Sequence, residues 1–144
     1  MSRVPAKGTW CVRRSEDGRV VAGRVCLAAD ARSRMVGLLG RTSLEPDEGL
    51  WLEPCNAVHA LGMRMAIDAV YLDREGRVLR VVAPLRPWRL GPLVLRARAV
   101  LELAAGAAEA AGVTPGDRLV RERAGEDTAG VQTAVGPARG GGRR

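Results

Sequence analysis

Cys55, His59, Arg64 and Asp68 lie within one short stretch of the 144-residue chain, and His59 is its only histidine. A cysteine with a histidine could form a nucleophile and its base, and the same pair could ligate a metal with help from carboxylates. A spacing of four residues brings Cys55 and His59 together on a helix. On a strand they would be about 13 Å apart at ~3.3 Å per residue. The segment has an extended pattern, so we expect a structural histidine bonded to backbone and predict no catalytic pair, metal site or cofactor.

Arg64 and Asp68 allow two interpretations. A loop across residues 62–66 would let Arg64 fold back over Asp68, forming an ion pair or, with His59, an anion pocket. Alternatively, Asp68 accepts backbone N–H groups and pins this turn, which would lower its pKa. We expect Asp68 to be structural and His59 and Arg64 to be exposed. If these side chains instead line a pocket, the candidate ligand-binding residues are His59, Arg64 and Asp68, with Arg96 from a later segment.

The composition narrows the classes of partner. The net charge is +7, carried almost wholly by arginine because Lys7 is the sole lysine. A basic balance attracts anionic ligands, nucleic acid or membrane surfaces. The few aromatic residues are too scattered for a base-stacking platform, and no phosphate-binding loop is present, so nucleic-acid binding is not predicted. The three cysteines include no CxxC pair, and we expect free thiols.

The chain is expected to be soluble and cytoplasmic. No apolar run approaches the roughly 18 residues that span a bilayer, and the N-terminal segment lacks the apolar core of a secretory signal. We expect residues 1–123 to form a single globular domain. Residues 124–144 lack periodicity and core side chains, and we expect a disordered tail there.

Turn signals and alternation predict many short strands. Thr9 to Arg14 and Arg19 to Leu27 are β-prone and flank an Asp-Gly step, which indicates a hairpin. Further strands are expected at residues 50–52, 67–72, 77–83, 95–103 and 118–121, and helices at 30–40 and 104–111. About seven short strands and two helices predict an α+β domain with a strongly bent, mostly antiparallel sheet or a small β-barrel-like form.

The segment from Leu95 to Leu103 has the clearest alternation. Its odd-numbered residues are apolar and are expected to face the core. Arg96, Arg98 and Glu102 are expected on an outward, solvated face. Leu101 and Leu103 are thus predicted core residues, and Arg96 is available to a ligand.

Four segments occur in an order that resembles a known family: SRMVGLLGRTSLEPDEGLWL, CNAVHALGMRMAIDAVYLD, RARAVLELAAG and GVTPGDRL. Over residues 20–121 the chain resembles the bacterial and archaeal family called domain of unknown function 192. The family's central motif, His-Thr-x-Gly-Met-Arg-x-Pro-Ile-Asp, is matched by His59, Gly62, Met63, Arg64, Ile67 and Asp68. Ala60 and Ala66 replace its Thr and Pro. The resemblance implies a compact, barrel-like α+β domain and no particular activity.

Three functions remain open at this point. One is a small binding module with a polar pocket around His59, Arg64 and Asp68 for an anionic small molecule or peptide end. Another is a hydrolase- or transferase-type enzyme with His59 as acid–base and Asp68 or Cys55 as its partner. The third is an accessory protein of a larger assembly. The sequence favours the binding module.

Overall fold

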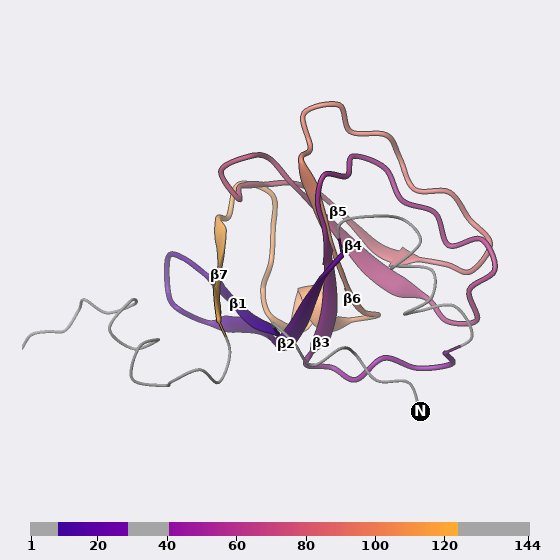
Figure 1. Ribbon diagram of the computed structural model, residues 1–144, viewed down its shortest axis with the longest axis horizontal. Coiled ribbons are helices and arrows are strands. Elements are labelled where there is room, and N and C mark those ends of the chain that lie inside the picture. The colour runs from indigo at the N-terminus through magenta and orange to yellow at the C-terminus, as the bar shows by residue number, and fades with distance from the viewer. Residues whose placement is uncertain (1–8, 29–40, 124–144) are drawn as a thin grey trace, which may run out of the picture.

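Within residues 9–28 and 41–123, the part of the chain that the computed structural model describes, seven strands form one curled sheet (Figure 1). One short helix, α2 (Ala107–Ala110), follows the sixth strand. The strands are β1 (Trp10–Arg14), β2 (Val20–Ala28), β3 (Glu48–Leu52), β4 (Ile67–Leu72), β5 (Val78–Leu85), β6 (Ala99–Ala104) and β7 (Leu119–Arg123).

The strand order across the sheet is β5-β4-β6-β3-β2-β1-β7. All neighbouring pairs are antiparallel except β2 with β3. The predicted hairpin joins β1 to β2, and Gly18 at its turn has φ 72°, a conformation that glycine adopts without strain. The mostly antiparallel, strongly bent sheet that the sequence predicts is confirmed.

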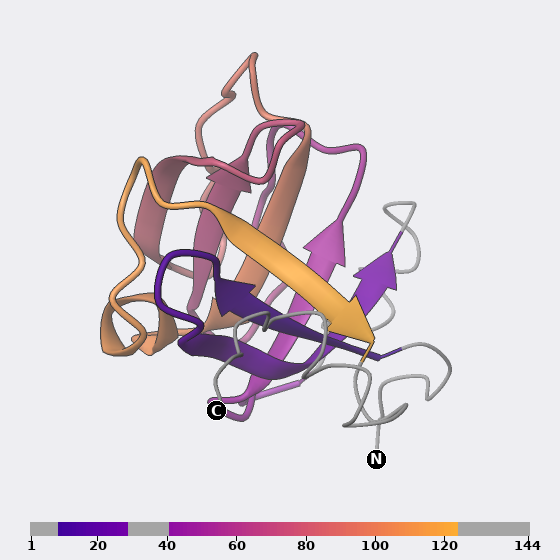
Figure 2. The same ribbon diagram turned by 90° about the vertical axis from the view of Figure 1, so that its left-hand side faces the viewer.

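The two outer strands of the sheet meet at one end. The amide of Val78, which begins β5, donates to the carbonyl of Asp117 at 2.7 Å, and the amide of Leu119, which begins β7, donates to Gly76 at 2.8 Å. Gly76 permits this approach, because a Cβ there would lie 2.6 Å from the carbonyl oxygen of Leu119. The sheet therefore curls into a half-barrel, and Figure 2 shows β7 running alongside β1 at its near side.

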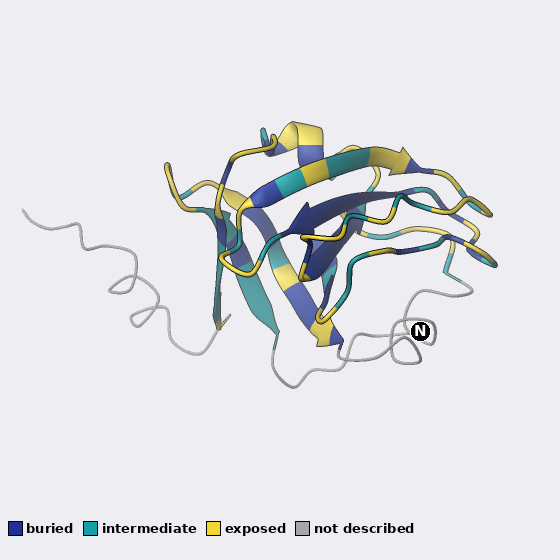
Figure 3. Cartoon of the chain, turned by 90° about the horizontal axis from the view of Figure 1, so that it is seen from above, coloured by how far each residue is buried: buried dark blue, intermediate teal, exposed yellow. Residues whose placement is uncertain are grey.

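Both faces of the central strands are buried. Every residue of β4 is buried, and Figure 3 shows this strand uniformly in the colour of buried residues. Val70, Leu72, Leu101 and Leu103 belong to one hydrophobic cluster. Alternate residues of the same strands belong to a second cluster on the opposite face, among them Ile67, Ala69, Tyr71 and Val100. The two long loops described below cover that second face.

Two expectations about β6 and its neighbours need correction. The strand begins at Ala99 and not at Leu95, whose side chain is 77% exposed. Glu102, expected on a solvated face, is fully buried because β6 lies between β3 and β4 and is covered on both sides. Leu101 and Leu103 are core residues as predicted.

The described part of the chain contains one helix, and this helix is shorter than predicted. The predicted helix at 104–111 is limited to Ala107–Ala110, since Ala104 still belongs to β6. The predicted helix at 30–40 and the predicted tail at 124–144 fall outside the described residues. None of the described helices is long and apolar enough to cross a membrane.

Candidate functional site

Two long connections lie side by side at one end of the molecule (Figure 1). Residues 54–66 lead from β3 to β4, and residues 86–98 lead from β5 to β6. Their backbones are joined by hydrogen bonds, from Ala60 N–H to the Arg89 carbonyl at 2.8 Å and from Gly91 N–H to the Val58 carbonyl at 2.9 Å. We call these two segments together the loop lobe. Its regular pairing makes it a defined surface and not a pair of independent loops.

His59 lies at the centre of this pairing. It forms an antiparallel bridge with Leu90, so the two side chains project from the same face of the lobe. Val58 and Ala60, on either side of it, are buried, so alternation places His59 on the outer face, where it is half-buried and not exposed as we expected. Its Nδ1 accepts a hydrogen bond from the Leu61 amide at 3.2 Å. The neutral ring therefore carries its proton on Nε2.

The lobe is anchored to the sheet by Tyr71 and Gly91. The Tyr71 hydroxyl donates to the Pro92 carbonyl at 2.8 Å. Burial, with a contribution from the nearby Cys55 thiol, raises the pKa of Tyr71 to about 12. A Cβ on Gly91 would lie 2.8 Å from that hydroxyl and 3.1 Å from the Val58 carbonyl oxygen, so only glycine lets the two segments approach this closely.

Basic side chains are concentrated on the lobe. Its two segments contain no acidic residue and five arginines, all exposed: Arg64, Arg86, Arg89, Arg96 and Arg98. Five of the seven exposed large hydrophobic residues of the described chain also lie here: Leu61, Trp88, Leu90, Leu93 and Leu95. The lobe is thus both cationic and apolar at its surface.

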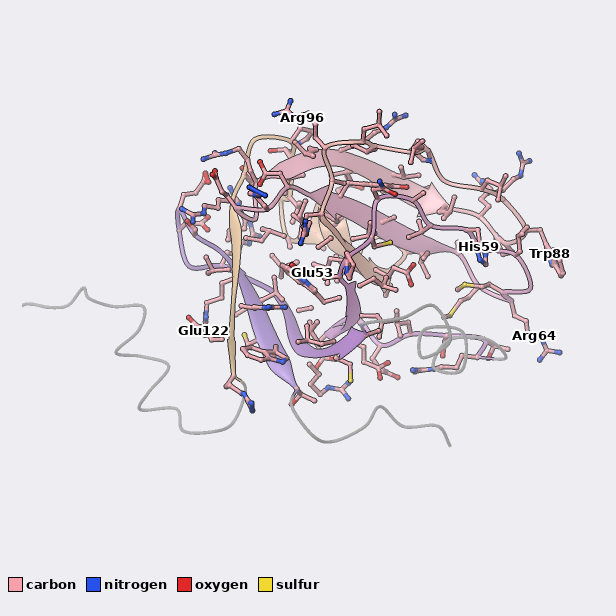
Figure 4. All side chains as sticks on the ribbon, turned by 45° about the horizontal axis from the view of Figure 1, so that its top comes forward. Glu53, His59, Arg64, Trp88, Arg96 and Glu122 are labelled. Carbon is pink, nitrogen blue, oxygen red and sulfur yellow. The ribbon has the colours of Figure 1, made fainter. Side chains whose placement is uncertain are left out.

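The four predicted site residues do not form one pocket. Figure 4 shows His59 and Arg64 at the same end of the molecule as Trp88, with Arg96 well separated from them. Asp68 is fully buried within β4. The structure therefore brings His59 and Arg64 to one surface, places Arg96 farther along the lobe, and encloses Asp68.

Asp68 pins a different turn from the one we expected. Its Oδ2 accepts the amides of Gly106 and Ala108, each at 3.0 Å, and so holds the turn from β6 into α2. The pKa of Asp68 is raised by burial, against the opposing effect of these two hydrogen bonds. The expected lowering was wrong in direction, because desolvation outweighs the hydrogen bonds at this depth.

The cysteine and histidine of the central stretch contact backbone groups. Cys55 Sγ donates to the Ala57 carbonyl at 3.2 Å, as His59 Nδ1 accepts from Leu61. Among the described residues, no three His, Cys, Asp or Glu side chains gather into a group that could hold a metal ion. These contacts favour a positioning role for both side chains within the lobe.

A stacked arrangement elsewhere was missed from the sequence. The Arg121 guanidinium lies over two indole rings, 5.1 Å from the Trp10 centroid and 4.8 Å from the Trp51 centroid. A pocket of about 200 Å³ opens beside Trp51, Glu53 and Arg121. Only the strand order, which puts β7 next to β1, brings Trp10 and Arg121 together, so no local sequence pattern could reveal the stack.

Three polar side chains of that pocket, those of Glu53, Asp73 and Arg121, already have partners within the protein. Glu53 accepts from the Trp51 indole N–H at 2.8 Å and lies 3.9 Å from Arg121. Asp73, which also lines the pocket, accepts the amides of Glu75 and Arg77. Burial alone would raise the pKa of Asp73, but these hydrogen bonds and the nearby charges of Arg77 and Arg96 lower it. Groups satisfied in this way offer little to a ligand. The lobe, whose arginines are exposed and have no acidic neighbour in its two segments, is the better candidate site.

Comparisons with known proteins agree with the fold. The DUF192 family model, described as Uncharacterized ACR, matches residues 12–121. A crystal structure of a protein of unknown function from Novosphingobium aromaticivorans DSM 12444 is similar at TM-score 0.66 and 24% identity, over 78% of this chain and 83% of that chain. A Sinorhizobium meliloti 1021 protein described as a proposed transcription regulator has the same score and identity, over 83% of this chain and 98% of that chain. No curated protein matches. Identities this low establish a shared fold alone.

Proposed function

Because this chain belongs to DUF192, whose description assigns no activity, we propose on structural grounds that it is a small binding module. Its binding surface is the loop lobe, and its partner is anionic. His59, Arg64 and Arg96 remain in the binding set and are joined by Arg86 and Arg89. Asp68 has a structural role.

The proposal rests on the separation of the lobe arginines from the ion-paired arginines found elsewhere in the protein. In the described part of the chain, the arginines that form ion pairs lie outside the lobe, such as Arg13 with Glu122, Arg24 with Asp47 and Arg41 with Glu48. The lobe's Arg96 is near enough to Asp73 to help lower the pKa of that carboxylate. The exposed lobe arginines have no acidic residue in their own segments. A guanidinium group presents a planar set of donors that matches a carboxylate or phosphate. A rigid surface carrying several of them is therefore suited to an anionic partner.

The contacts of the candidate residues favour binding over catalysis. The Asp68 carboxylate is enclosed and bonded to backbone amides, so it is poorly placed to assist His59. In the neutral ring the basic lone pair is on Nδ1, and this nitrogen already accepts the Leu61 amide, so the atom that would act as a general base is engaged by the loop itself. A general base must reach the proton that it removes. A binding role needs none of this geometry.

Anisotropy of a fluorescein-labelled poly-glutamate peptide tests the proposal. The lobe variant carries Arg86→Glu and Arg89→Glu. The control carries Arg74→Glu and Arg80→Glu, two exposed arginines outside the lobe that change the net charge equally. At low salt we expect the lobe variant to bind at least about tenfold more weakly than wild type, and the control to bind within about twofold.

Two results would overturn the proposal. One is an absence of peptide binding by the wild-type protein at low ionic strength. The other is equal weakening in the two variants, which would show that net charge alone attracts the peptide and that the lobe has no special role.

A further inference from the structure

We infer that the anionic partner of the loop lobe is a lipid membrane surface. The inference rests on the proposed function and adds the class of partner. Basic side chains alone would suit any polyanion. The exposed apolar side chains that accompany them narrow the choice, because they need a partner that can remove them from water.

The apolar side chains of the lobe are unusually exposed for their size. Trp88 is 67% exposed, Leu90 is 71% exposed and Leu95 is 77% exposed. Outside the lobe, the exposed large hydrophobic residues of the described chain are Val20 at 45% and Leu27 at 43%. Leucine and tryptophan surrounded by arginine are the side chains that peripheral proteins place into the interface between headgroups and acyl chains.

Trp88 is exposed, and its backbone has a conformation that a bulky residue adopts only with strain. It is the one non-glycine residue with positive φ in the described chain, at 65°. Its amide donates to the Ala60 carbonyl at 2.7 Å, which fixes the turn. A bulky residue with positive φ is strained, whereas glycine adopts this backbone conformation without strain. A tryptophan at a strained, exposed position is expected where its side chain contacts a binding partner.

The rigidity of the lobe suits insertion. The backbone pairing around His59 and Leu90, together with the Tyr71 bond to Pro92, fixes the loops before any partner arrives. A preorganised surface loses less conformational entropy on binding than flexible loops would. Leu90, Leu93 and Leu95 can therefore enter a membrane interface without a folding step.

A membrane fits this surface better than an acidic protein does. The exposed leucines are spread along an extended segment, from Trp88 at one end of the molecule toward Arg96, which Figure 4 shows far from it. A lipid surface is laterally fluid, so its anionic headgroups can gather around dispersed arginines while its acyl region accepts dispersed side chains. A protein partner would need a complementary cleft along the whole segment.

Vesicle co-sedimentation tests the inference. The probes are phosphatidylcholine vesicles with and without phosphatidylglycerol. The leucine variant carries Leu90→Ser, Leu93→Ser and Leu95→Ser and leaves every charge in place. Its control carries Val20→Ser and Leu27→Ser. Binding is expected only with phosphatidylglycerol, weakened at least about tenfold in the leucine variant and within about twofold of wild type in the control.

Trp88→Gly provides a second variant that separates binding from folding. Glycine relieves the positive φ, so the melting temperature should stay equal or rise while vesicle binding falls severalfold. Brominated acyl chains should quench wild-type tryptophan fluorescence, and the quenching should be lost in Trp88→Gly. A fall in melting temperature equal to that of a core substitution, or quenching that survives the change, overturns the role given to Trp88.

The outcomes separate this inference from the proposed function. If vesicles bind the leucine variant as well as wild type, or do not bind at all, while the poly-glutamate peptide still depends on Arg86 and Arg89, the membrane assignment fails and the anionic binding surface stands. A different outcome assigns the surface to a protein partner: a leucine-containing poly-glutamate peptide binds the leucine variant more weakly than wild type, while the wild-type protein does not bind vesicles. If neither peptide nor vesicles bind, both proposals fail.

Discussion

His59 and Leu90 face each other as an antiparallel pair, although one lies between β3 and β4 and the other between β5 and β6. This pairing converts two long loops into one surface. It also explains why the single histidine of the chain lies beside exposed leucines and arginines and not beside Asp68. The binding surface that we propose depends on this contact between the two loops.

Gly91→Ala should disrupt the lobe. The new Cβ would lie 2.8 Å from the Tyr71 hydroxyl and 3.1 Å from the Val58 carbonyl oxygen, so one of these must move. We expect a loss of about 1–3 kcal/mol in the free energy of unfolding, typical of overpacking, with weaker binding to anionic probes. Gly23→Ala is the control, because nothing lies within 4 Å of its added Cβ. Urea denaturation that ranks the two variants equally would show that the close approach is not required.

Asp68→Asn should destabilise the protein by about 1–3 kcal/mol, because the buried carboxylate holds two backbone amides. The effect should depend on pH. The folded pKa of Asp68 is raised, so the folded protein keeps this proton at pH values where the unfolded chain has lost it. The stability contributed by that proton is fully present below about pH 3.9 and is lost as pH rises through the folded pKa.

Asparagine cannot ionise, so its cost relative to wild type should be largest in acid and smaller at neutral pH. Denaturant midpoints for both proteins, measured across that pH range, check this sign. A difference that grows with pH would mean that the folded pKa is lowered after all.

Leu101→Ala should cost about 2–5 kcal/mol, because this side chain is fully buried in the cluster shared by β4 and β6 and its removal leaves a cavity. Arg98→Ala should change stability by less than about 0.5 kcal/mol, because its side chain is exposed and its backbone contacts survive the change. The reverse ranking in chemical denaturation would contradict the facing of β6.

His59→Ala and Arg64→Ala should each cost less stability than Asp68→Asn. Arg64 is exposed, and the contact of His59 with Leu61 is local to its own loop. Both variants should instead weaken binding to anionic probes. A larger loss of stability for either one than for Asp68→Asn would mean that the motif serves to lock the fold.

Local signals were enough to predict most strands. Alternation between residues 67 and 72 and the Asp-Gly step before β2 depend on neighbours in sequence, and both predictions are confirmed. The misassigned start of β6 has a physical cause. Leu93 and Leu95 continue the apolar pattern into a loop, and alternation cannot distinguish a leucine that faces a core from one that faces outward.

The candidate site was harder to predict because it depends on long-range pairing. Arg86, Trp88 and Arg89 lie in a proline-rich segment with no regular period. Backbone bonds of Trp88 and Arg89 to Ala60 place this segment beside the loop that carries His59. Asp68 was correctly expected to accept backbone amides, but its partners Gly106 and Ala108 come from across the sheet. Sequence spacing alone pointed to the nearer turn.

An NMR titration of the isotope-labelled protein with inositol hexakisphosphate, a soluble polyanion, tests directly whether the loop lobe is the anion-binding surface. We predict that amide shift changes concentrate in residues 54–66 and 86–98, with the largest near His59, Arg89 and Leu90, and that Arg86→Glu with Arg89→Glu removes them. Shift changes concentrated around Trp51, Glu53 and Arg121 would contradict the claim and place the anion site at the pocket beside the indole stack.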